Sequence, residues 1–440
     1  MMKNKKFIPV SVFFLFFVII AIQGGELLFA DPVREINQAL IKAGSEDVAI
    51  VGVNLIDGRR DVPLGDATVL VSNGRIKAAG PRSEIVVPKN ATVIEGKGLS
   101  LLPGMMDSHF HLENDLGLPS LYLTHGITSV RDPGGWIEDY DSVVQSLAPT
   151  PRLFLAGPLL DYPPPAYPKG SYLLRDAAEA RVAVNTLIDR GNSAVKVYFR
   201  LPLGIIQVVV ETAHARGIPV TAHLETVKAD DAILAGVDGI EHVTSLGTAL
   251  LPPREAEAYR QSVIADNAAR GEGRYRIWSQ IDLNSPRVKS LLDLMVWRGT
   301  TLSPTLAVFE LRAGDPNVKD FNVRGYSQML QFTGMAKRAG VRVVAGSHSA
   351  VSHAERGWAY QREMELLVES GLTPMEAIQA GTLENARFFR IEDRLGSIEP
   401  GKTADLILVE GDPSKNISAL RQIKRVMLAG QWIRTDVPQK

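Results

Sequence analysis

The chain of 440 residues contains no cysteine, and this absence excludes several kinds of site at once. Disulfide bonds, thiolate metal ligands, iron–sulfur clusters and a cysteine nucleophile all require that residue. The chain also lacks an excess of either charge, because 48 Lys and Arg residues stand against 49 Asp and Glu residues. A formal net charge of −1 gives no overall field that would attract nucleic acid. We therefore expect no nucleic-acid partner, and any metal must bind to histidine, a carboxylate or a modified lysine.

Composition excludes a disordered or fibrous protein. Apolar residues make up 45% and charged residues 22% of the chain, which is ordinary for a globular protein. At about 150 residues per domain, a chain of this length forms two or three domains, or one large barrel with an appendage. The chain is therefore long enough to bury a large hydrophobic core.

The N-terminal segment 1–30 has the layout of a secretory signal peptide. Lysine residues precede an apolar run over residues 7–22, and a polar break follows the run. Leu28 and Ala30 match the −3 and −1 positions of a cleavage site before Asp31. The sequence thus predicts a secreted or periplasmic protein. The alternative is an uncleaved membrane anchor formed by residues 7–22, although this run is shorter than the roughly 20 residues that span a bilayer comfortably.

Short β-type runs occur at both ends of the remaining chain. Over residues 48–94 these runs are broken by turn signals such as Asn73-Gly74, and Asn-Gly between two apolar runs indicates a hairpin. Similar runs return near the C-terminus in ADLILVEG and KRVMLAGQWIR. We therefore expect residues 31–104 and 391–440 to form one small composite β-sandwich domain.

Between these two segments, apolar runs of strand length alternate with amphipathic helical stretches. This alternation predicts a parallel sheet with crossover helices. Eight such strands over residues 105–390 fit an α/β fold of the TIM-like (β/α)8 barrel type, whose active sites lie at the carboxyl ends of the strands. Residues 250–286 are charged and partly helical, so we expect an insertion over the barrel mouth. The predicted strands end near residues 107–111, 129–131, 153–156, 195–199, 220–223, 239–242, 302–305 and 343–348.

Five of the eight histidines fall at the carboxyl end of a predicted strand. His109 and His111 are two residues apart, and the period of a strand turns both side chains to the same face. A lone His-x-His pair is a weak signal, and surface or core histidines are the ordinary interpretation. The position at strand ends favours a metal site instead, because imidazole is a common ligand of zinc-like ions. The five residues are His109, His111, His223, His242 and His348.

Lys196 stands in the otherwise apolar strand SAVKVYF. A bare ammonium group inside a barrel is costly to desolvate. One interpretation is a lysine that pairs with a carboxylate at the rim or extends its head to water. The other is a carbamate formed with CO2, which converts the cation into a carboxylate-like ligand able to bridge two metal ions.

Several longer segments resemble the amidohydrolase superfamily, in particular imidazolonepropionase-like and prolidase-like metal-dependent hydrolases. The similarity extends from about residue 48 to residue 433 and includes LLPGMMDSHFHL, GITSVRDPGG, AVKVYF, TAHLET, GVDGIEHV, SPTL and LTPMEAIQAGTLENARFFRIEDRLGSIEPGKTADLILVEGDP. The resemblance implies a TIM-like barrel with a composite β-sandwich. It also implies one or two divalent metal ions, taken as zinc, that activate a water for attack on an amide carbonyl. The implied ligands are His109 and His111 on one ion, carbamylated Lys196 as the bridge, and His223 and His242 on the second ion.

One position departs from the family pattern. The family ends its eighth strand with a Gly-Thr-Asp type motif, whose Asp binds metal and accepts a proton, whereas this chain reads VRVVAGSHS with His348 at that position. A neutral imidazole, with an unperturbed pKa near ~6.5, is a competent proton acceptor at neutral pH. A nitrogen that binds metal cannot also take the proton, so we expect His348 to act mainly as the catalytic base. Loss of the Asp charge leaves open whether the site holds one ion or two.

The sequence as a whole predicts a secreted metal-dependent amidohydrolase that acts on a small amide, such as a dipeptide or a cyclic amide. The alternative is a weakly active or non-catalytic ligand-binding relative, because His348 replaces the Asp. Ester or lactone hydrolysis and deamination are further possibilities on the same scaffold. Tyr198 and Arg200 are candidate contacts for a substrate carboxylate, since arginine offers a bidentate fork, although a loop arginine more often has no such role. The substrate and the oligomeric state stay open.

Overall fold

The fold described here is that of a computed structural model, in which residues 33–146 and 148–433 are described. The predicted signal peptide, residues 1–30, lies outside the described residues. No helix within the two described ranges combines the length and the apolar character that a membrane crossing needs.

The two ends of the described chain meet in one sheet of eight strands. Strand β5 (Leu99–Pro103) pairs antiparallel with β15 (Leu406–Glu410), with partners running from Leu99 opposite Glu410 to Pro103 opposite Leu406. The strand order is β17-β16-β15-β5-β1-β2-β3, and β4 pairs with β1. That this composite sheet forms a sandwich stays a prediction. The other strands are β1 (Val48–Leu55), β2 (Leu64–Ser72), β3 (Arg75–Pro81), β4 (Thr92–Glu95), β16 (Ile423–Leu428) and β17 (Gln431–Ile433).

The hairpin between β2 and β3 forms where the sequence predicts it. Asn73 and Gly74 have φ angles of 49° and 71°, and these left-handed conformations suit the tight turn whose twist matches that of paired strands. The apolar side chains of the two strands are buried against β15 and β16 in a small core of their own. Val69, Val71 and Ile76 belong to this core.

The middle of the chain forms two parallel sheets, so the predicted α/β class is confirmed. Three strands form one sheet and six form the other, in the order β10-β9-β11-β12-β13-β14. Strands β9 and β10, around the proline-rich turn, were not among the expected strands. The strands are β6 (Met105–Asp107), β7 (Ile127–Asp132), β8 (Arg152–Leu155), β9 (Leu159–Asp161), β10 (Ser171–Leu173), β11 (Val195–Val197), β12 (Val220–Ala222), β13 (Gly239–Glu241) and β14 (Thr301–Ser303).

Backbone hydrogen bonds connect the two parallel sheets to each other. The N–H of Ser193, just before β11, donates to the carbonyl of Leu155 in β8 at 2.8 Å. On the other side, the N–H of Ser108 donates to the carbonyl of Ala345 at 3.0 Å. The segment around residue 345 is in turn bonded to β14 through a Val343–Leu302 bridge. The carboxyl ends of β6 and β14 are thereby held close to one another.

The expected strand over residues 343–348 is wrong beyond its first residue. Val343 makes an isolated β-bridge with Leu302, and no longer ladder forms there. The chain then turns sharply, because His348 and Ser349 have φ angles of 64° and 65°. An extended strand requires negative φ at every residue with a side chain. The segment therefore ends as a tight turn directed at the neighbouring β6.

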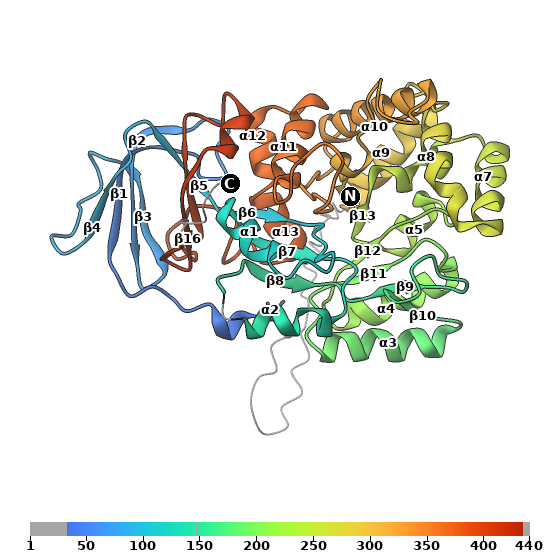
Figure 1. Cartoon of the computed structure of the whole chain (residues 1–440), viewed down its shortest axis with the longest axis horizontal. Coiled ribbons are helices and arrows are strands. Elements are labelled where there is room, and N and C mark those ends of the chain that lie inside the picture. The colour runs from blue at the N-terminus through green and yellow to red at the C-terminus, as the bar shows by residue number, and fades with distance from the viewer. Residues whose placement is uncertain (1–32, 147, 434–440) are drawn as a thin grey trace, which may run out of the picture.

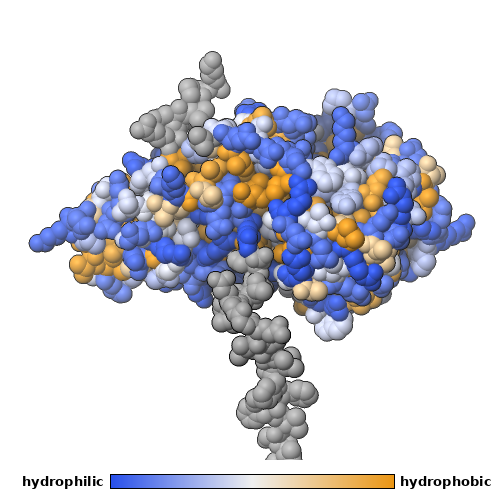
Figure 2. Space-filling view, turned by 90° about the horizontal axis from the view of Figure 1, so that it is seen from below, coloured by the Kyte–Doolittle hydropathy of each residue, from blue (hydrophilic) through white to orange (hydrophobic). Residues whose placement is uncertain are grey.

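Helices cover the parallel strands, and α4 (Leu203–Ala215) shows why they form. Its buried residues Ile206, Val209, Val210 and Ala213 recur every three or four positions and form one apolar face. Figure 1 shows the composite sheet at one end of the molecule and the helix-covered parallel strands at the other. Apolar side chains gather near the middle of the face in Figure 2. The other helices are α1 (Leu118–Thr124), α2 (Asp141–Gln145), α3 (Ala177–Asp189), α5 (Ala229–Ala235), α6 (Gly247–Leu250), α7 (Pro253–Ala265), α8 (Arg270–Trp278), α9 (Pro286–Arg298), α10 (Asp320–Arg338), α11 (Ala359–Glu369), α12 (Pro374–Ala380) and α13 (Leu383–Phe389).

Short 3₁₀ segments complete the described chain. They are η1 (Gln38–Leu40), η2 (Ile137–Tyr140), η3 (Val243–Leu246), η4 (Asn267–Ala269), η5 (Leu306–Phe309) and η6 (Ile417–Arg421). The expected insertion over residues 250–286 contains α7, η4 and α8.

A buried ion pair ties the composite sheet to the parallel strands. Arg152 in β8 donates from Nε and Nη2 to the two carboxylate oxygens of Asp405, at 2.6 and 3.1 Å. Its Nη1 lies 3.5 Å from Glu35, near the start of the described chain. Burial alone would lower the pKa of Arg152, but the carboxylates of Asp405 and Glu35 raise it above its usual value. The pair therefore stays ionised.

Replacing this arginine tests the connection. We expect Arg152→Met to lower the free energy of unfolding by about 3–5 kcal/mol, because it leaves the Asp405 carboxylate buried without its partner. The matched control is Arg356→Met, which breaks an exposed bidentate pair with Asp115 and costs within about 1 kcal/mol. Denaturant unfolding of both variants gives the comparison. Equal losses would show that the buried pair does not hold the two parts together.

Candidate active site

A large cavity opens at the carboxyl ends of the parallel strands. Its volume is about 1350 Å³, and its wall includes segments that follow β6, β7, β11, β12 and β13. Helix α8 of the insertion also contributes residues to the wall. The structure brings together in this cavity seven of the eight residues that the sequence nominated, namely His109, His111, Lys196, Tyr198, His223, His242 and His348.

The first two histidines follow β6 and do not lie within it. Strand β6 ends at Asp107, whose Oδ1 accepts a hydrogen bond from the backbone N–H of His109 at 3.0 Å. The Nε2 atoms of His109 and His111 nevertheless lie 3.1 Å apart. The strand period therefore predicted the right neighbours, although a carboxylate-anchored loop brings them together.

A buried carboxylate orients His109. Its Nδ1 lies 2.7 Å from Oε2 of Glu241, and Glu241 also accepts bonds from Arg131 and Thr221. Burial, followed by the charge of Lys196, lowers the pKa of His109 well below its usual value, so the ring is neutral. An ionised carboxylate only accepts, so Nδ1 carries the proton and Nε2 keeps a lone pair. That lone pair is available on the cavity side, where His111 lies.

A hydroxyl group orients His242 in the same way. Its Nδ1 lies 2.6 Å from Oγ1 of Thr305, and this hydroxyl donates its own proton to the carbonyl of Pro304 at 2.8 Å. Thr305 therefore accepts from Nδ1, and Nε2 of His242 keeps the lone pair. Burial, and then the charge of His223, lowers the pKa of His242 well below its usual value.

His223 presents its other ring nitrogen. Its Nε2 lies 3.1 Å from Nη2 of Arg274 and 3.3 Å from Oε1 of Glu225. Its Nδ1 is buried and has no hydrogen-bond partner among the described residues. Burial lowers the pKa of His223 to about 3 despite the bond to Glu225. The guanidinium of Arg274 only donates, so Nε2 accepts in that contact and the proton of the neutral ring lies on Nδ1. His223 can therefore bind a metal ion only if one of its nitrogens gives up that proton or that contact.

Lys196 lies inside the wall of the cavity with 1% of its surface exposed. Burial lowers the pKa of its ammonium group to about 8, although the charge of Glu241 opposes the shift. The neutral amine is therefore far more accessible than in an exposed lysine. This state is the one that reacts with CO2, so the geometry is compatible with the predicted carbamate.

His348 is held against the β6 loop. Its N–H donates to the carbonyl of His109 at 2.6 Å, and the adjacent Ser347 donates from N and Oγ to the carboxylate of Asp107. Ser349 accepts a bond from the N–H of His111 at 2.7 Å. One ring nitrogen from each of three residues, His109, His242 and His348, lies within 4.8 Å of the others.

The two predicted substrate contacts end up in different places. Tyr198 lines the cavity, and its hydroxyl accepts a bond from Nη1 of Arg270 at 3.1 Å. Arg200 is not among the residues of the cavity wall; its guanidinium donates to the carbonyls of Val263 and Ile264 and to the side chain of Asn267. Arg200 therefore holds the insertion, and Arg270 takes the position at the cavity that the sequence assigned to Arg200.

Sequence reasoning missed the charged residues behind and beside the histidines. Two of these residues stand within or beside motifs that the sequence itself shows. Asp132 ends β7 in the segment SVRDPGG, and Glu241 directly precedes His242. No local pattern connects Arg270 and Arg274 with the cavity, because they belong to an insertion whose position depends on the whole fold. The missed residues are Asp132, Glu225, Glu241, Arg270 and Arg274.

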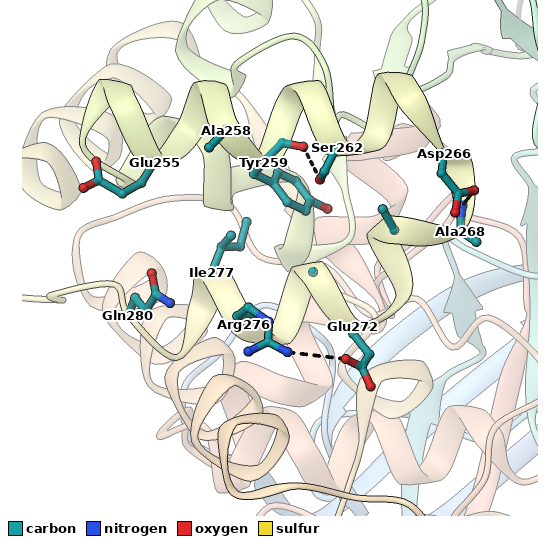
Figure 3. Close-up of a pocket in the computed structure, with 12 residues that line it drawn as sticks. Glu255, Ala258, Tyr259, Ser262, Asp266, Ala268, Glu272, Arg276, Ile277 and Gln280 are labelled. Atoms are coloured by element: carbon teal, nitrogen blue, oxygen red, sulfur yellow. Dashed lines mark hydrogen bonds and ion pairs between the residues drawn. The ribbon is translucent and has the colours of Figure 1, made fainter.

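The insertion carries a second, more open hollow between α7 and α8, with a volume of about 600 Å³ (Figure 3). An ion pair between Glu272 and Arg276 lies on its α8 side. Tyr259 of α7 lines this hollow, while its hydroxyl donates to Glu225 at 2.6 Å. The hollow contains no histidine, so it is not the candidate active site. Its helices serve to position Glu225 and Arg274 beside His223.

Comparison with known proteins identifies the family of this architecture. A model described as the amidohydrolase family matches residues 100–433. The adenine deaminase of Staphylothermus marinus is 24% identical over 409 residues, which cover 85% of this chain and 55% of that protein. The N-acyl-D-aspartate deacylase of Alcaligenes xylosoxydans is 31% identical over 218 residues, 48% of this chain and 38% of that protein.

Among solved structures, a Xaa-Pro dipeptidase with bound methionine has the same fold. Its TM-score is 0.68 at 24% identity, and the match covers 88% of this chain and all of that one. The present chain spans about half the length of the curated adenine deaminases that it matches.

The role of Arg200 can be tested by proteolysis. We expect Arg200→Met to raise the rate of protease cleavage within residues 253–278 several-fold, because the guanidinium no longer ties the insertion to the strand ends. Arg216→Met, which removes a surface pair with Asp189, is the control and should leave the cleavage rate unchanged. Mass spectrometry of the fragments gives the cut sites. Parent-like cleavage in Arg200→Met would contradict this role.

Proposed function

This chain belongs to the amidohydrolase family, and we propose that it is a metal-dependent hydrolase that cleaves a carbon–nitrogen bond in a small molecule. The convergence of five histidines and one buried lysine on the wall of one cavity carries the proposal. Those side chains come from segments far apart in sequence, so a purely structural role does not account for their meeting at one point. Neutral imidazoles facing an open space are typical of a metal centre.

The residues present fit a divalent ion such as zinc. His109 and His242 each keep a lone pair on Nε2, while His223 and His348 each have a buried Nδ1 without a partner among the described residues. Imidazole nitrogens suit zinc, and a buried nitrogen without a partner is costly unless a ligand satisfies it. When bound, such an ion lowers the pKa of a water and polarises a carbonyl. The two-ion arrangement bridged by carbamylated Lys196 stays a prediction, and the proposed function requires one ion.

We place the site at the mouth of a closed (β/α)8 barrel. The hydrogen bonds from Ser193 to Leu155 and from Ser108 to Ala345 support closure, because they link the two parallel sheets on both sides. The similarity in fold to the Xaa-Pro dipeptidase is compatible with this architecture. In such barrels the loops after the strands surround the reacting groups, and this matches the wall of the cavity.

A small amide that carries a carboxylate suits the cavity. Arg270 stacks over the rings of Phe199 and Tyr167, at 4.6 and 5.3 Å, and bonds to Tyr198 without pairing with a carboxylate of the described chain. A substrate carboxylate would complete its bonding. The similarity to a Xaa-Pro dipeptidase and to an N-acyl-D-aspartate deacylase supports an amide of this kind. A dipeptide is therefore the first substrate to test.

Hydrolytic deamination of a purine is a second candidate. The match to adenine deaminase covers 85% of this chain, and this observation favours it. The aromatic side chains of Trp136, Tyr167 and Phe309 in the cavity wall could stack on a flat ring. Both candidates break a carbon–nitrogen bond, and they differ in the group that leaves.

Metal removal and a substrate panel test the proposal. We expect the zinc-loaded protein to hydrolyse at least one member of a panel of dipeptides, N-acyl amino acids, cyclic amides and adenine. Dialysis against a chelator should abolish turnover, and added zinc should restore it, because the imidazoles hold the ion reversibly. His353→Ala, which removes a histidine outside the cavity wall, is the control and should keep full turnover. A metal-loaded protein that binds panel members without turnover would instead be a ligand-binding relative.

We also propose that the protein is exported. The basic start and the apolar run over residues 7–22 support this location. We expect the exported form to begin near Asp31, and intact-mass spectrometry of protein recovered outside the cytoplasm measures that end directly. An exported form that retains Met1 would favour the membrane anchor.

A further inference from the structure

We propose that Arg362 and Glu363, two consecutive residues of α11, are positioning residues that hold the η5 turn and, through Thr305, fix the direction of the His242 imidazole. The inference rests on the proposed function and deepens it, because it identifies what keeps one imidazole of the site in place. Neither residue of α11 belongs to the wall of the cavity. They act on the site from outside, through the short turn that lies between them and the histidine.

The η5 turn (Leu306–Phe309) contacts His242 from both of its ends. Just before the turn begins, Oγ1 of Thr305 lies 2.6 Å from Nδ1 of His242 and accepts its proton. At the last residue of the turn, the ring of Phe309 packs edge-on against the imidazole, with ring centroids 5.5 Å apart. The tautomer and the tilt of His242 therefore depend on where η5 lies.

Thr305 keeps a backbone conformation that its residue type disfavours. Its φ and ψ are both 50°, in the left-handed region, where a β-branched residue is a rare exception. His242 also has a positive φ, of 67°, so the residues on both sides of the hydrogen bond are strained. Strain of this kind persists only where the surrounding structure fixes it. A contact from outside η5 must therefore hold the turn.

Glu363 supplies that contact at the start of η5. The N–H of Leu306 donates to its Oε1 at 3.0 Å, and the N–H of Ala307 donates to its Oε2 at 2.7 Å. These two N–H groups directly follow Thr305, and the first N–H groups of a helical turn have no partner within the turn. Both oxygens of the Glu363 carboxyl group are thus bonded to the segment that carries Thr305.

The burial of Glu363 is costly, which argues against a role in stability alone. Its side chain is fully buried in the molecule. Burial raises the pKa of Glu363 to about 8, although the bonds from Ala307 and Leu306 oppose this shift. The desolvation of the carboxyl group therefore outweighs what the two bonds return to it. Perturbed groups of this kind are found preferentially near functional sites.

Arg362 holds the other end of the same turn. Its Nε and Nη2 donate to the two carboxylate oxygens of Glu310, at 2.9 and 2.7 Å. Glu310 directly follows the last residue of η5. Helix α11 is itself anchored in the core by buried residues such as Met364 and Leu367. Two neighbouring residues of one fixed helix therefore hold η5 at its beginning and at its end.

The test measures the zinc affinity of the full chain by competition with a chelator, so it does not require a known substrate. Removal of a group that orients a ligand histidine typically lowers metal affinity about 10–100-fold, and we expect a loss in this range for Thr305→Val. We expect Glu363→Gln to weaken zinc binding about tenfold, because its amide nitrogen cannot accept an N–H. The double variant should lose no more affinity than Thr305→Val alone, since both changes act along one path.

Glu376→Gln is the matched control. It alters a carboxylate that also accepts a backbone N–H, that of Thr373 at 2.8 Å, but at the start of α12 and away from η5. This variant should bind zinc as the parent does. Arg362→Met releases the other end of the turn and should weaken zinc binding at least about threefold. If Glu363→Gln fails to fold, Arg362→Met decides in its place.

The outcomes separate this inference from the proposed function. Folded variants at positions 362 and 363 that bind zinc as tightly as the parent would overturn the inference and leave metal binding intact. A double variant whose loss equals the sum of the two single losses, expressed as free energies, would also overturn it, because a purely structural role of α11 is independent of Thr305. A parent chain that binds no zinc would instead overturn the proposed function, and the inference with it.

Discussion

The buried carboxylate of Asp107 is the constraint on which the geometry of the site depends. It accepts hydrogen bonds from the backbone N–H of His109 and from both the N–H and the hydroxyl of Ser347. These bonds join the loop after β6 to the turn that carries His348. Burial raises the pKa of Asp107 to about 6, and the bonds it accepts oppose that shift. Two further bonds join the same loops, because the N–H of His348 donates to the carbonyl of His109 and the N–H of His111 donates to Ser349.

Two other buried carboxylates contact imidazoles of the cavity. Glu241 lies behind His109 and pairs with Arg131, while Glu225 lies beside His223 and pairs with Arg274. Each carboxylate is buried, so a partner is needed to offset its desolvation. Glu241 and Glu225 thus orient imidazoles from behind, while charged residues such as Asp132, Arg270 and Arg274 also line the cavity.

The insertion completes the wall on the side away from β6. Arg200 ties α7 to the loop after β11, and Tyr259 of α7 bonds to Glu225. Helix α8 then places Arg270 and Arg274 one helical turn apart along the cavity. His223 follows β12, so its distance from Arg270 depends on how α8 packs against the ends of the strands. The histidines and the two arginines of the cavity thus come from different elements of the fold.

The sequence by itself determined the α/β class, the hairpin at Asn73-Gly74 and the meeting of the histidines at strand ends, because these features follow from local periodicity and residue type. Tertiary structure decided what each histidine faces. The bond between His109 and Glu241 spans 132 positions, and the contact of Ser347 with Asp107 spans 240, so no local pattern encodes either. The same reason explains why Arg200 proved to hold the insertion. A side chain's residue type limits the bonds that it can make, but the partner is chosen only when distant segments of the chain pack together.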